Sequence, residues 1–224
     1  MKSKLIQLAA ATVLATTAAS ALADVVVIGD RDAFNALGTI AYNSNFDDFG
    51  AGFHLPGDPF TRGGVTYASD QNLTVGAGTD FGIGTLRTLM SNNYFSGLAG
   101  TIATGYTLFG FDAAVSEGDV PGAARVVDIT LTTNQATYTF GGVTLADGVT
   151  GLTFQGFQAT GAGEYFTGFR IATLGDGHLA GMTDVAVGVS PVPEPATGLL
   201  LVGGLGVLGL ARWRSGKRAS SPRR

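Results

Sequence analysis

Residues 125–140 read RVVDITLTTNQATYTF, and apolar and polar side chains alternate through most of this segment. In its first half, every second residue is apolar: Val127, Ile129 and Leu131. The residues between and after them are polar: Asp128, Thr130 and Thr132. Successive side chains of a β-strand point to opposite faces, so this pattern predicts a strand with one buried face. Asn134-Gln135 then offers a turn, and the alternation resumes in residues 136–140. The segment therefore predicts a β-hairpin.

Similar segments recur between residues 24 and 190. Further strands are predicted at 25–28, 65–67, 106–113, 152–157, 166–173 and 183–189. Glycine-rich breaks separate them, and many short strands with frequent glycine turns are typical of two-layered all-β domains. We therefore expect an all-β fold, a β-sandwich or jelly roll, with one short helix over residues 32–37. Asp32 would cap this helix at its N-terminus, and Gly38 would end it.

The first 23 residues have the pattern of a secretory signal peptide. Lys2 and Lys4 precede a short apolar stretch, and Ala21-Leu22-Ala23 forms a small-x-small cleavage site in front of Asp24. We expect cleavage after Ala23, which makes Asp24 the first residue of the mature chain. An uncleaved N-terminal anchor is disfavoured because the apolar part is shorter than the ~20 residues of a membrane span. The passenger domain is then predicted to cover residues 24–190.

The composition of this passenger restricts its chemistry. It has no cysteine, so core burial alone must stabilise the domain after export. Five arginines and no lysine stand against 16 aspartates and glutamates between residues 24 and 190, a formal net charge of −11. Such a surface repels phosphate backbones, so nucleic acid is not an expected partner.

The C-terminal segment, residues 191–224, has three parts in a fixed order. Pro193-Glu194-Pro195 comes first. Its prolines favour an extended chain that leads to the membrane. The uncharged residues 196–211 follow and would form a transmembrane helix about 24 Å long at 1.5 Å per residue. Residues 212–224 then form a basic tail without acids, in which Arg212, Arg214, Lys217 and Arg218 would stop the helix. This bias predicts a cytoplasmic C-terminus and a passenger outside the cell.

The proline motif, the glycine- and leucine-rich helix and the arginine cluster together resemble the PEP-CTERM sorting signal, also catalogued as the ice-binding protein C-terminal domain. The resemblance implies an exported protein of a Gram-negative bacterium that is cleaved by signal peptidase and then by an exosortase-like enzyme of the inner membrane. The final location would be the cell surface or the extracellular matrix. A plain C-terminal anchor is the alternative. The resemblance covers residues 191–224 and concerns sorting only.

The passenger shows no catalytic motif. It has no cysteine, and its only histidines are His54 and His178, so we name no catalytic residue and expect a protein that is not an enzyme. A hydrolase with an unrecognised acid pair is the alternative, since glycosidases use two carboxylates. Glu117 and Glu164 are the only glutamates of the passenger, and both adjoin glycines. We expect both to be solvated loop charges.

Ligand binding remains as a second class of function. Asp47-Asp48, and Asp176 with Asp184, could supply oxygen ligands to a structural Ca²⁺, but no Asp-x-Asp-x-Asp-Gly loop is present, so no metal or cofactor is expected. The aromatic-glycine-aromatic segments around residues 106–112 and 165–169 are similar to PEP-CTERM passenger domains thought to be lectin-like or jelly-roll sandwiches. Sugar sites use aromatic faces, and the tyrosines are candidates because the sole tryptophan, Trp213, lies next to the predicted membrane helix. A carbohydrate-binding module for exopolysaccharide is therefore the alternative to a purely structural passenger.

Overall fold

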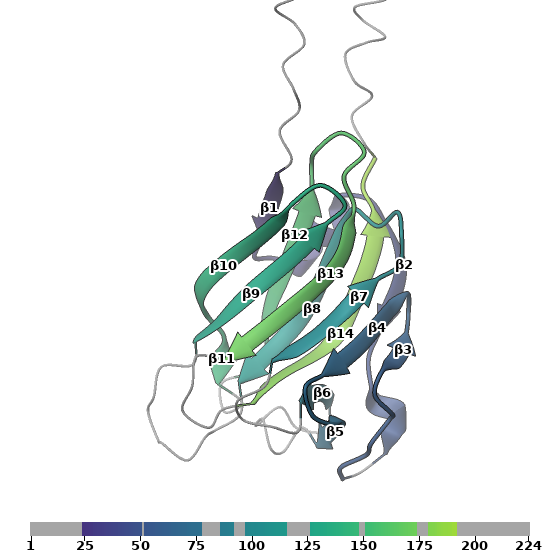
Figure 1. Ribbon diagram of the computed structural model, residues 1–224, viewed down its shortest axis with the longest axis vertical. Coiled ribbons are helices and arrows are strands. Elements are labelled where there is room, and N and C mark those ends of the chain that lie inside the picture. The colour runs from purple at the N-terminus through teal and green to yellow at the C-terminus, as the bar shows by residue number, and fades with distance from the viewer. Residues whose placement is uncertain are drawn as a thin grey trace, which may run out of the picture. The chain divides into compact units, whose positions relative to one another are not determined.

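The structure, a computed structural model, describes residues 24–50, 52–77, 86–91, 97–115, 126–147, 151–173 and 179–191. These residues form two β-sheets packed face to face, as Figure 1 shows. The described strands and the three clusters of buried apolar side chains found among the described residues lie between Val25 and Val189, and the compact unit ends at Pro191. The segment 24–191 therefore holds its own core and is suitable for study as a separate domain.

The larger sheet has eight strands in the order β1-β12-β8-β14-β6-β5, with β2 paired to β14 and β11 paired to β8. Their bounds are β1 Val25–Ile28, β2 Thr39–Ser44, β5 Leu73–Ala77, β6 Arg87–Ser91, β8 Leu108–Val115, β11 Ala146–Asp147, β12 Thr153–Ala159 and β14 Ala180–Val189. All pairings are antiparallel except the two-residue contact of β11 with β8. Strand β14 is central, because β8 pairs with one of its edges and β2 and β6 share the other.

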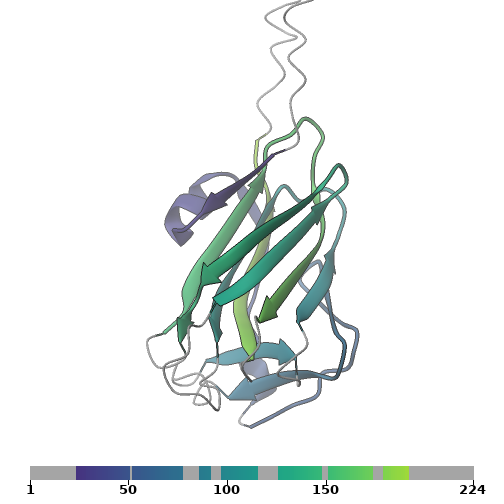
Figure 2. The ribbon, with the colours of Figure 1, turned by 60° about the vertical axis from the view of Figure 1, so that its left-hand side comes forward.

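The smaller sheet is antiparallel and has six strands in the order β10-β9-β13-β7-β4-β3. Their bounds are β3 Phe60–Arg62, β4 Val65–Ser69, β7 Leu98–Ile102, β9 Val126–Thr133, β10 Thr137–Thr144 and β13 Phe166–Thr173. Figure 2 shows the two layers from the side. Both layers contribute to one core, since the ring of Phe109 in β8 lies 5.0 Å from that of Phe169 in β13.

The all-β prediction is confirmed, with two sheets and, among the described residues, one α-helix. Residues 126–133 and 137–144 form the predicted hairpin, and the three apolar side chains of β9 are buried as expected: Val127, Ile129 and Leu131. The predictions for β1 and β13 match the observed bounds, while those for β4, β8, β12 and β14 differ by a few residues at one end or both. The sequence did not predict β2, β3, β5, β6, β7 or β11.

The helix, α2, covers Arg31–Ala36, and its predicted N-cap was wrong. Asp30 and not Asp32 is the cap, because Asp30 has extended backbone angles and its Oδ1 accepts a hydrogen bond of 2.7 Å from the Ala33 nitrogen. Asp32 lies in the first turn, where its negative charge interacts favourably with the positive end of the helix dipole. The helix ends before Gly38, as predicted.

Helix α2 packs on the outer face of the eight-stranded sheet. Its one buried side chain, Phe34, contacts Leu108 of β8 and Ala186 of β14 and meets the Phe154 ring edge-on at 5.4 Å. Gly110 of β8 makes room for these rings, because a Cβ at Gly110 would lie 2.9 Å from Phe154 and 3.1 Å from Phe34. The helix thus covers the part of this sheet face that lies over β8 and β12.

Candidate functional site

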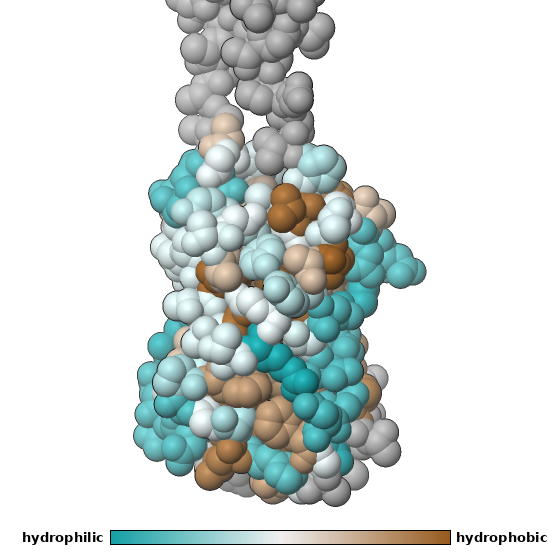
Figure 3. Space-filling model, turned by 90° about the vertical axis from the view of Figure 1, so that its right-hand side faces the viewer, coloured by the Kyte–Doolittle hydropathy of each residue, from teal (hydrophilic) through white to brown (hydrophobic). Residues whose placement is uncertain are grey.

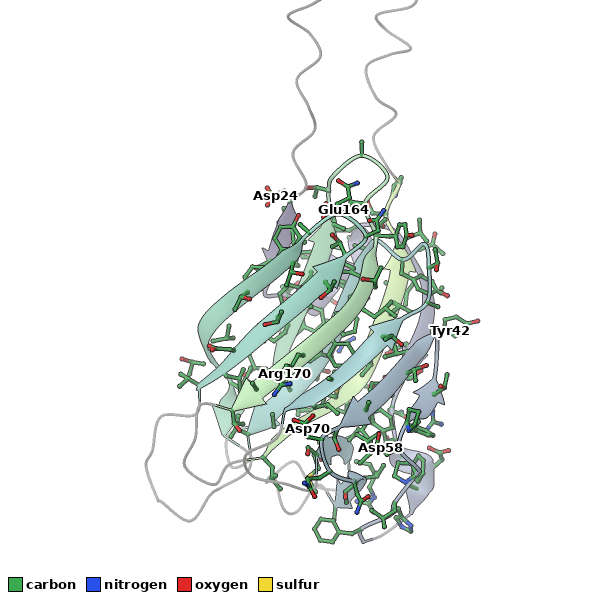
Figure 4. All side chains as sticks on the ribbon, viewed as in Figure 1. Asp24, Tyr42, Asp58, Asp70, Glu164 and Arg170 are labelled. Carbon is green, nitrogen blue, oxygen red and sulfur yellow. The ribbon has the colours of Figure 1, made fainter. Side chains whose placement is uncertain are left out.

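The two ends of the domain lie at the same end of the sandwich. Asp24 precedes β1 and Ser190 follows β14, and a row of backbone hydrogen bonds crosses the sheet between them. These bonds run from Thr160 N to Asp24 O (2.9 Å), from Ala159 N to Thr107 O (2.9 Å) and from Thr107 N to Gly188 O (3.0 Å). Figure 4 shows Asp24 and Glu164 at this end. The predicted cleavage point before Asp24 and the start of the sorting segment after Ser190 therefore share one end of the domain.

Ser190 is held firmly at this end. Its side chain is buried, its nitrogen donates to Thr107 Oγ1 at 2.8 Å, and its hydroxyl accepts from Gln158 Nε2 at 2.8 Å. These contacts fix the chain directly before Pro191. The end of β14 is thus tied to Thr107, which precedes β8, and to Gln158 of β12.

Glu164 lies at the same end, in the turn between β12 and β13, and the prediction of a solvated charge was wrong. The residue is only 2% exposed. Its carboxylate accepts four hydrogen bonds: from Thr133 Oγ1 (2.7 Å), Tyr138 hydroxyl (2.8 Å), Asp24 N (3.1 Å) and Gly161 N (3.1 Å). Two hydroxyls and two backbone amides thus take the place of water around this buried charge. Glu164 joins the start of β1 to the β9–β10 hairpin.

The contact with Glu164 affects the pKa of the Tyr138 phenol. Burial and then the hydrogen bond to the Glu164 carboxylate raise the pKa of Tyr138 to about 12. Both effects act in the same direction, because a phenolate would be poorly solvated and would face a second negative charge. Tyr138 therefore stays a donor to Glu164 over the physiological pH range.

The aspartates considered for Ca²⁺ have other partners. Asp48 binds Arg62 through two hydrogen bonds of 2.8 and 3.0 Å, which lower the pKa of Asp48. Asp47 Oδ1 accepts from the Arg87 nitrogen at 2.9 Å. Asp176 and Glu117 lie outside the described residues. In the part of the chain that the structure describes, no three histidine, aspartate or glutamate side chains are grouped so that they could hold a metal ion.

Asp184 lies in a bulge of β14 with a φ of 44°, a conformation that costs energy for a residue with a side chain. Burial, followed by the nearby Asp112 carboxylate, raises the pKa of Asp184. Arg31 of α2 stabilises the bulge, since its Nη2 donates to the Asp184 carbonyl at 2.9 Å and lies 2.9 Å from Asp112 Oδ2. This cluster therefore fastens α2 to the sheet.

The two histidines and the tyrosines were further candidates. His54 forms an isolated β-bridge with Val75, and its ring contacts Phe49; His178 is outside the described residues. Tyr67 is fully buried, and burial raises its pKa. Tyr42, by contrast, is 49% exposed and meets the Tyr106 ring edge-on at 6.3 Å.

A glycine turn supports the pair of tyrosine rings. A Cβ at Gly64 would lie 3.1 Å from Tyr106 and 3.4 Å from Tyr42, so the β3–β4 turn packs directly against both. Figure 4 places Tyr42 at the edge of the domain. On the side that Figure 3 presents, hydrophobic residues form small patches separated by hydrophilic ones. An exposed aromatic side chain in such a mixed surface is compatible with a sugar site.

The fold and this end of the sandwich define a class: an all-β domain of two packed sheets whose C-terminal strand leads directly into a separate C-terminal segment. Residues 191–218 of that segment match the family model of the PEP-CTERM protein-sorting motif. The chain thus carries a PEP-CTERM sorting motif, as the sequence predicted. No curated protein matches the chain.

Several predicted functional residues lie outside the described part of the chain. They are the cleavage-site residues Ala21 and Ala23, the motif Pro193, Glu194 and Pro195, and the basic residues Arg212, Arg214, Lys217 and Arg218. The predicted signal peptide 1–23 and transmembrane helix 196–211 are outside it as well. Among the described helices, none has the length and apolar character needed to cross a membrane.

Proposed function

We propose that this chain is an exported, non-enzymatic protein of the cell surface or extracellular matrix of a Gram-negative bacterium, and that an exosortase-like enzyme processes its C-terminus. The observation that carries the proposal is the PEP-CTERM motif at residues 191–218, which begins directly after the last residues of the folded domain. The motif implies export and membrane-associated sorting of the passenger that precedes it. Residues 24–190 are then the cargo.

The domain is well arranged for this role. Only Pro191 and Val192 separate the anchored Ser190 from Pro193, and three extended residues span at most about 11 Å. In this proposal the motif follows the folded domain within a few residues, residues 196–211 span the membrane and the tail 212–224 stays in the cytoplasm. The acidic passenger would then be outside, and the basic tail would meet the anionic inner leaflet.

The structure also supports a passenger without catalysis. Among the described carboxylates that were candidates, Glu164 is saturated with hydrogen bonds, Asp48 is paired with Arg62, and Asp47 accepts a backbone amide. A general acid or nucleophile needs an accessible carboxyl group; Glu164 is buried, and the exposed Asp47 and Asp48 are engaged by the Arg87 nitrogen and the Arg62 side chain.

Replacement of Pro193, Glu194 and Pro195 by alanine tests the sorting proposal in the native host. The variant passenger should stay in the membrane fraction on immunoblots, while the wild-type passenger is recovered at the surface or in the medium. Pro222→Ala is the matched control, since it removes a C-terminal proline outside the motif and leaves every charge in place. Equal release of the triple variant and the control would contradict processing at the motif.

A second function, carbohydrate binding by the passenger, is favoured by the exposed Tyr42 ring beside Tyr106. Calorimetry of residues 24–190 against the exopolysaccharide of the host, with and without Ca²⁺, tests it. Tyr42→Ala should abolish binding, whereas Phe53→Ala, which removes an exposed ring outside this pair, should leave it unchanged. Absence of binding by the unmodified domain would eliminate this function.

A further inference from the structure

The carboxylate of Glu164 is buried, and no basic side chain among the described residues binds it. The passenger has no lysine, and the described arginines have other partners: Arg31 contacts Asp112, Arg62 contacts Asp48, Arg87 donates to Gly50 O, and Arg170 approaches Asp70. A buried carboxylate that lacks a cation is costly even when it is hydrogen bonded. The four donors around Glu164 reduce this cost, but they leave a net negative charge.

One of those donors is the backbone nitrogen of Asp24, whose position is set independently by the sheet. Val25 pairs with Ala159, and the Asp24 carbonyl accepts from both the nitrogen and the hydroxyl of Thr160 at 2.9 and 3.2 Å. The Asp24 nitrogen then lies 3.1 Å from Glu164 Oε2; both residues are labelled in Figure 4. This nitrogen belongs to the residue in front of which the sequence predicts signal-peptide cleavage.

From this coincidence we infer that Glu164 is the binding site of the α-ammonium group that cleavage creates on Asp24. In the uncleaved chain, the Asp24 nitrogen is a neutral amide with one hydrogen. Hydrolysis of the Ala23–Asp24 peptide bond consumes one water, leaves a carboxylate on Ala23, and gives Asp24 an amine that takes up a proton. The hydrogen bond from a neutral amide to a carboxylate then becomes an ion pair in a partly buried site.

The inference rests on the proposed export, and it adds a role for cleavage in the fold. Strand β1 lies at the edge of its sheet and pairs with β12 alone. The ion pair fixes its first residue to the turn between β12 and β13 and, through Thr133 and Tyr138, to the β9–β10 hairpin. Removal of the signal peptide therefore locks the N-terminal edge of the domain in its final state.

The passenger offers a clean chemical test. Because residues 24–191 contain no lysine, the α-amine is the only primary amine of the mature domain. The groups that face it are the Glu164 carboxylate, the Tyr138 phenol and the side chain of Asp24 itself. An ion pair raises the pKa of the α-ammonium group above its ordinary range of about 7.7 to 8.0, so less free amine is present at pH 8. The ammonium then favours the folded state at neutral pH, and this effect is lost as the pH rises through the raised pKa.

The experiment compares three domains: residues 24–191 released from a fusion by a protease that cuts directly before Asp24, the same domain with Glu164→Gln, and a domain that keeps Leu22-Ala23 in front of Asp24. Acetylation by an amine-selective reagent at pH 8 is followed by mass spectrometry. We expect the first domain to react about fivefold more slowly than the other two, because a pKa raised by about one unit lowers the free-amine fraction at pH 8 from about 0.6 to about 0.12. The extended domain retains Glu164, so the result does not depend on the folding of the glutamine variant.

Equal acetylation rates for the first and the extended domain would overturn the inference. N-terminal sequencing of the protein from the host cell envelope separates this failure from that of the proposed function. An exported chain that begins at a residue other than Asp24 would contradict only the ammonium site. A chain retained in the cytoplasm with residues 1–23 attached would contradict export and, with it, the inference.

Discussion

Replacement of Phe34 by alanine should remove the anchor of helix α2. The helix has only six residues, and isolated helices shorter than ~12 residues are marginal in water, so packing must hold it. Phe34 is fully buried against Leu108, Ala186 and Phe154. Truncation of a buried phenylalanine costs about 3–5 kcal/mol, of which about 0.5–1.5 kcal/mol belongs to the lost ring pair. This is a large part of a typical stability of 5–15 kcal/mol, so the variant should fold with a much lower urea midpoint.

Urea unfolding of residues 24–191, followed by circular dichroism, measures the loss of free energy. Asn35→Ala is the matched control, because Asn35 lies in the same helix and is exposed, and it should change the free energy of unfolding by no more than about 0.5 kcal/mol. Hydrogen exchange of the Leu37 amide, which donates to the Phe34 carbonyl, reports on the helix itself. A loss below about 1 kcal/mol for Phe34→Ala, with the Leu37 amide still protected, would refute the role assigned to this packing.

Three further predictions concern the same structure. Asp30→Ala removes the observed N-cap and should lower the free energy of unfolding by about 1 kcal/mol, whereas Asp32→Ala should cost less; the reverse order would contradict the assignment of the cap. Gly110→Ala places a methyl group against Phe34, and urea unfolding should show a loss of about 1–3 kcal/mol that shrinks when Phe34 is also alanine. Because the pKa of Tyr138 is raised to about 12, its contribution to stability is full below pH ~10 and is lost as the pH approaches 12; Tyr138→Phe should flatten this part of the pH profile, and an unaltered profile would count against the Glu164 contact.

Alternating burial made β9 predictable from the sequence, and its absence explains why β5 and β6 were missed. Strand β9 alternates between buried and half-exposed side chains, so its period of two is visible in the sequence. In β5 and β6, LTVGA and RTLMS, four of the five residues are buried, which removes the alternation. Strand β7, LAGTI, carries Gly100, where a Cβ would lie 2.5 Å from the Phe169 ring and 2.7 Å from the Thr66 carbonyl oxygen, and a glycine in a sequence indicates a break. A period of two therefore reveals β9 and is absent from β5 and β6, although β8 and β14, which are also buried along most of their length, were predicted.

The error at Glu164 has a different cause. The sequence Gly163-Glu164-Tyr165 has the composition of an exposed turn, and Glu164 does lie between β12 and β13, but its side chain is buried. Its burial comes from partners that are far away in the sequence: Asp24 is 140 residues distant, Thr133 is 31 and Tyr138 is 26. Local composition carries no information on such contacts. The sequence offered one signal of this contact. Predicted cleavage before Asp24 would give the mature chain a positively charged α-ammonium group, for which a carboxylate is a suitable partner.

The position of β14 connects the fold with the proposed sorting. It is the last strand of the chain, and it is also the centre of the larger sheet, because β8 pairs with one edge and β2 and β6 share the other. Without β14, the strands β1, β12 and β8 would be separated from β6 and β5, and β2 would have no neighbour. If the chain is exported from its N-terminus, as proposed, this sheet can be completed only after residue 189 has crossed the membrane. Under the same proposal, a sorting enzyme that acts at Pro193–Pro195 would act after the last strand of the sheet is available.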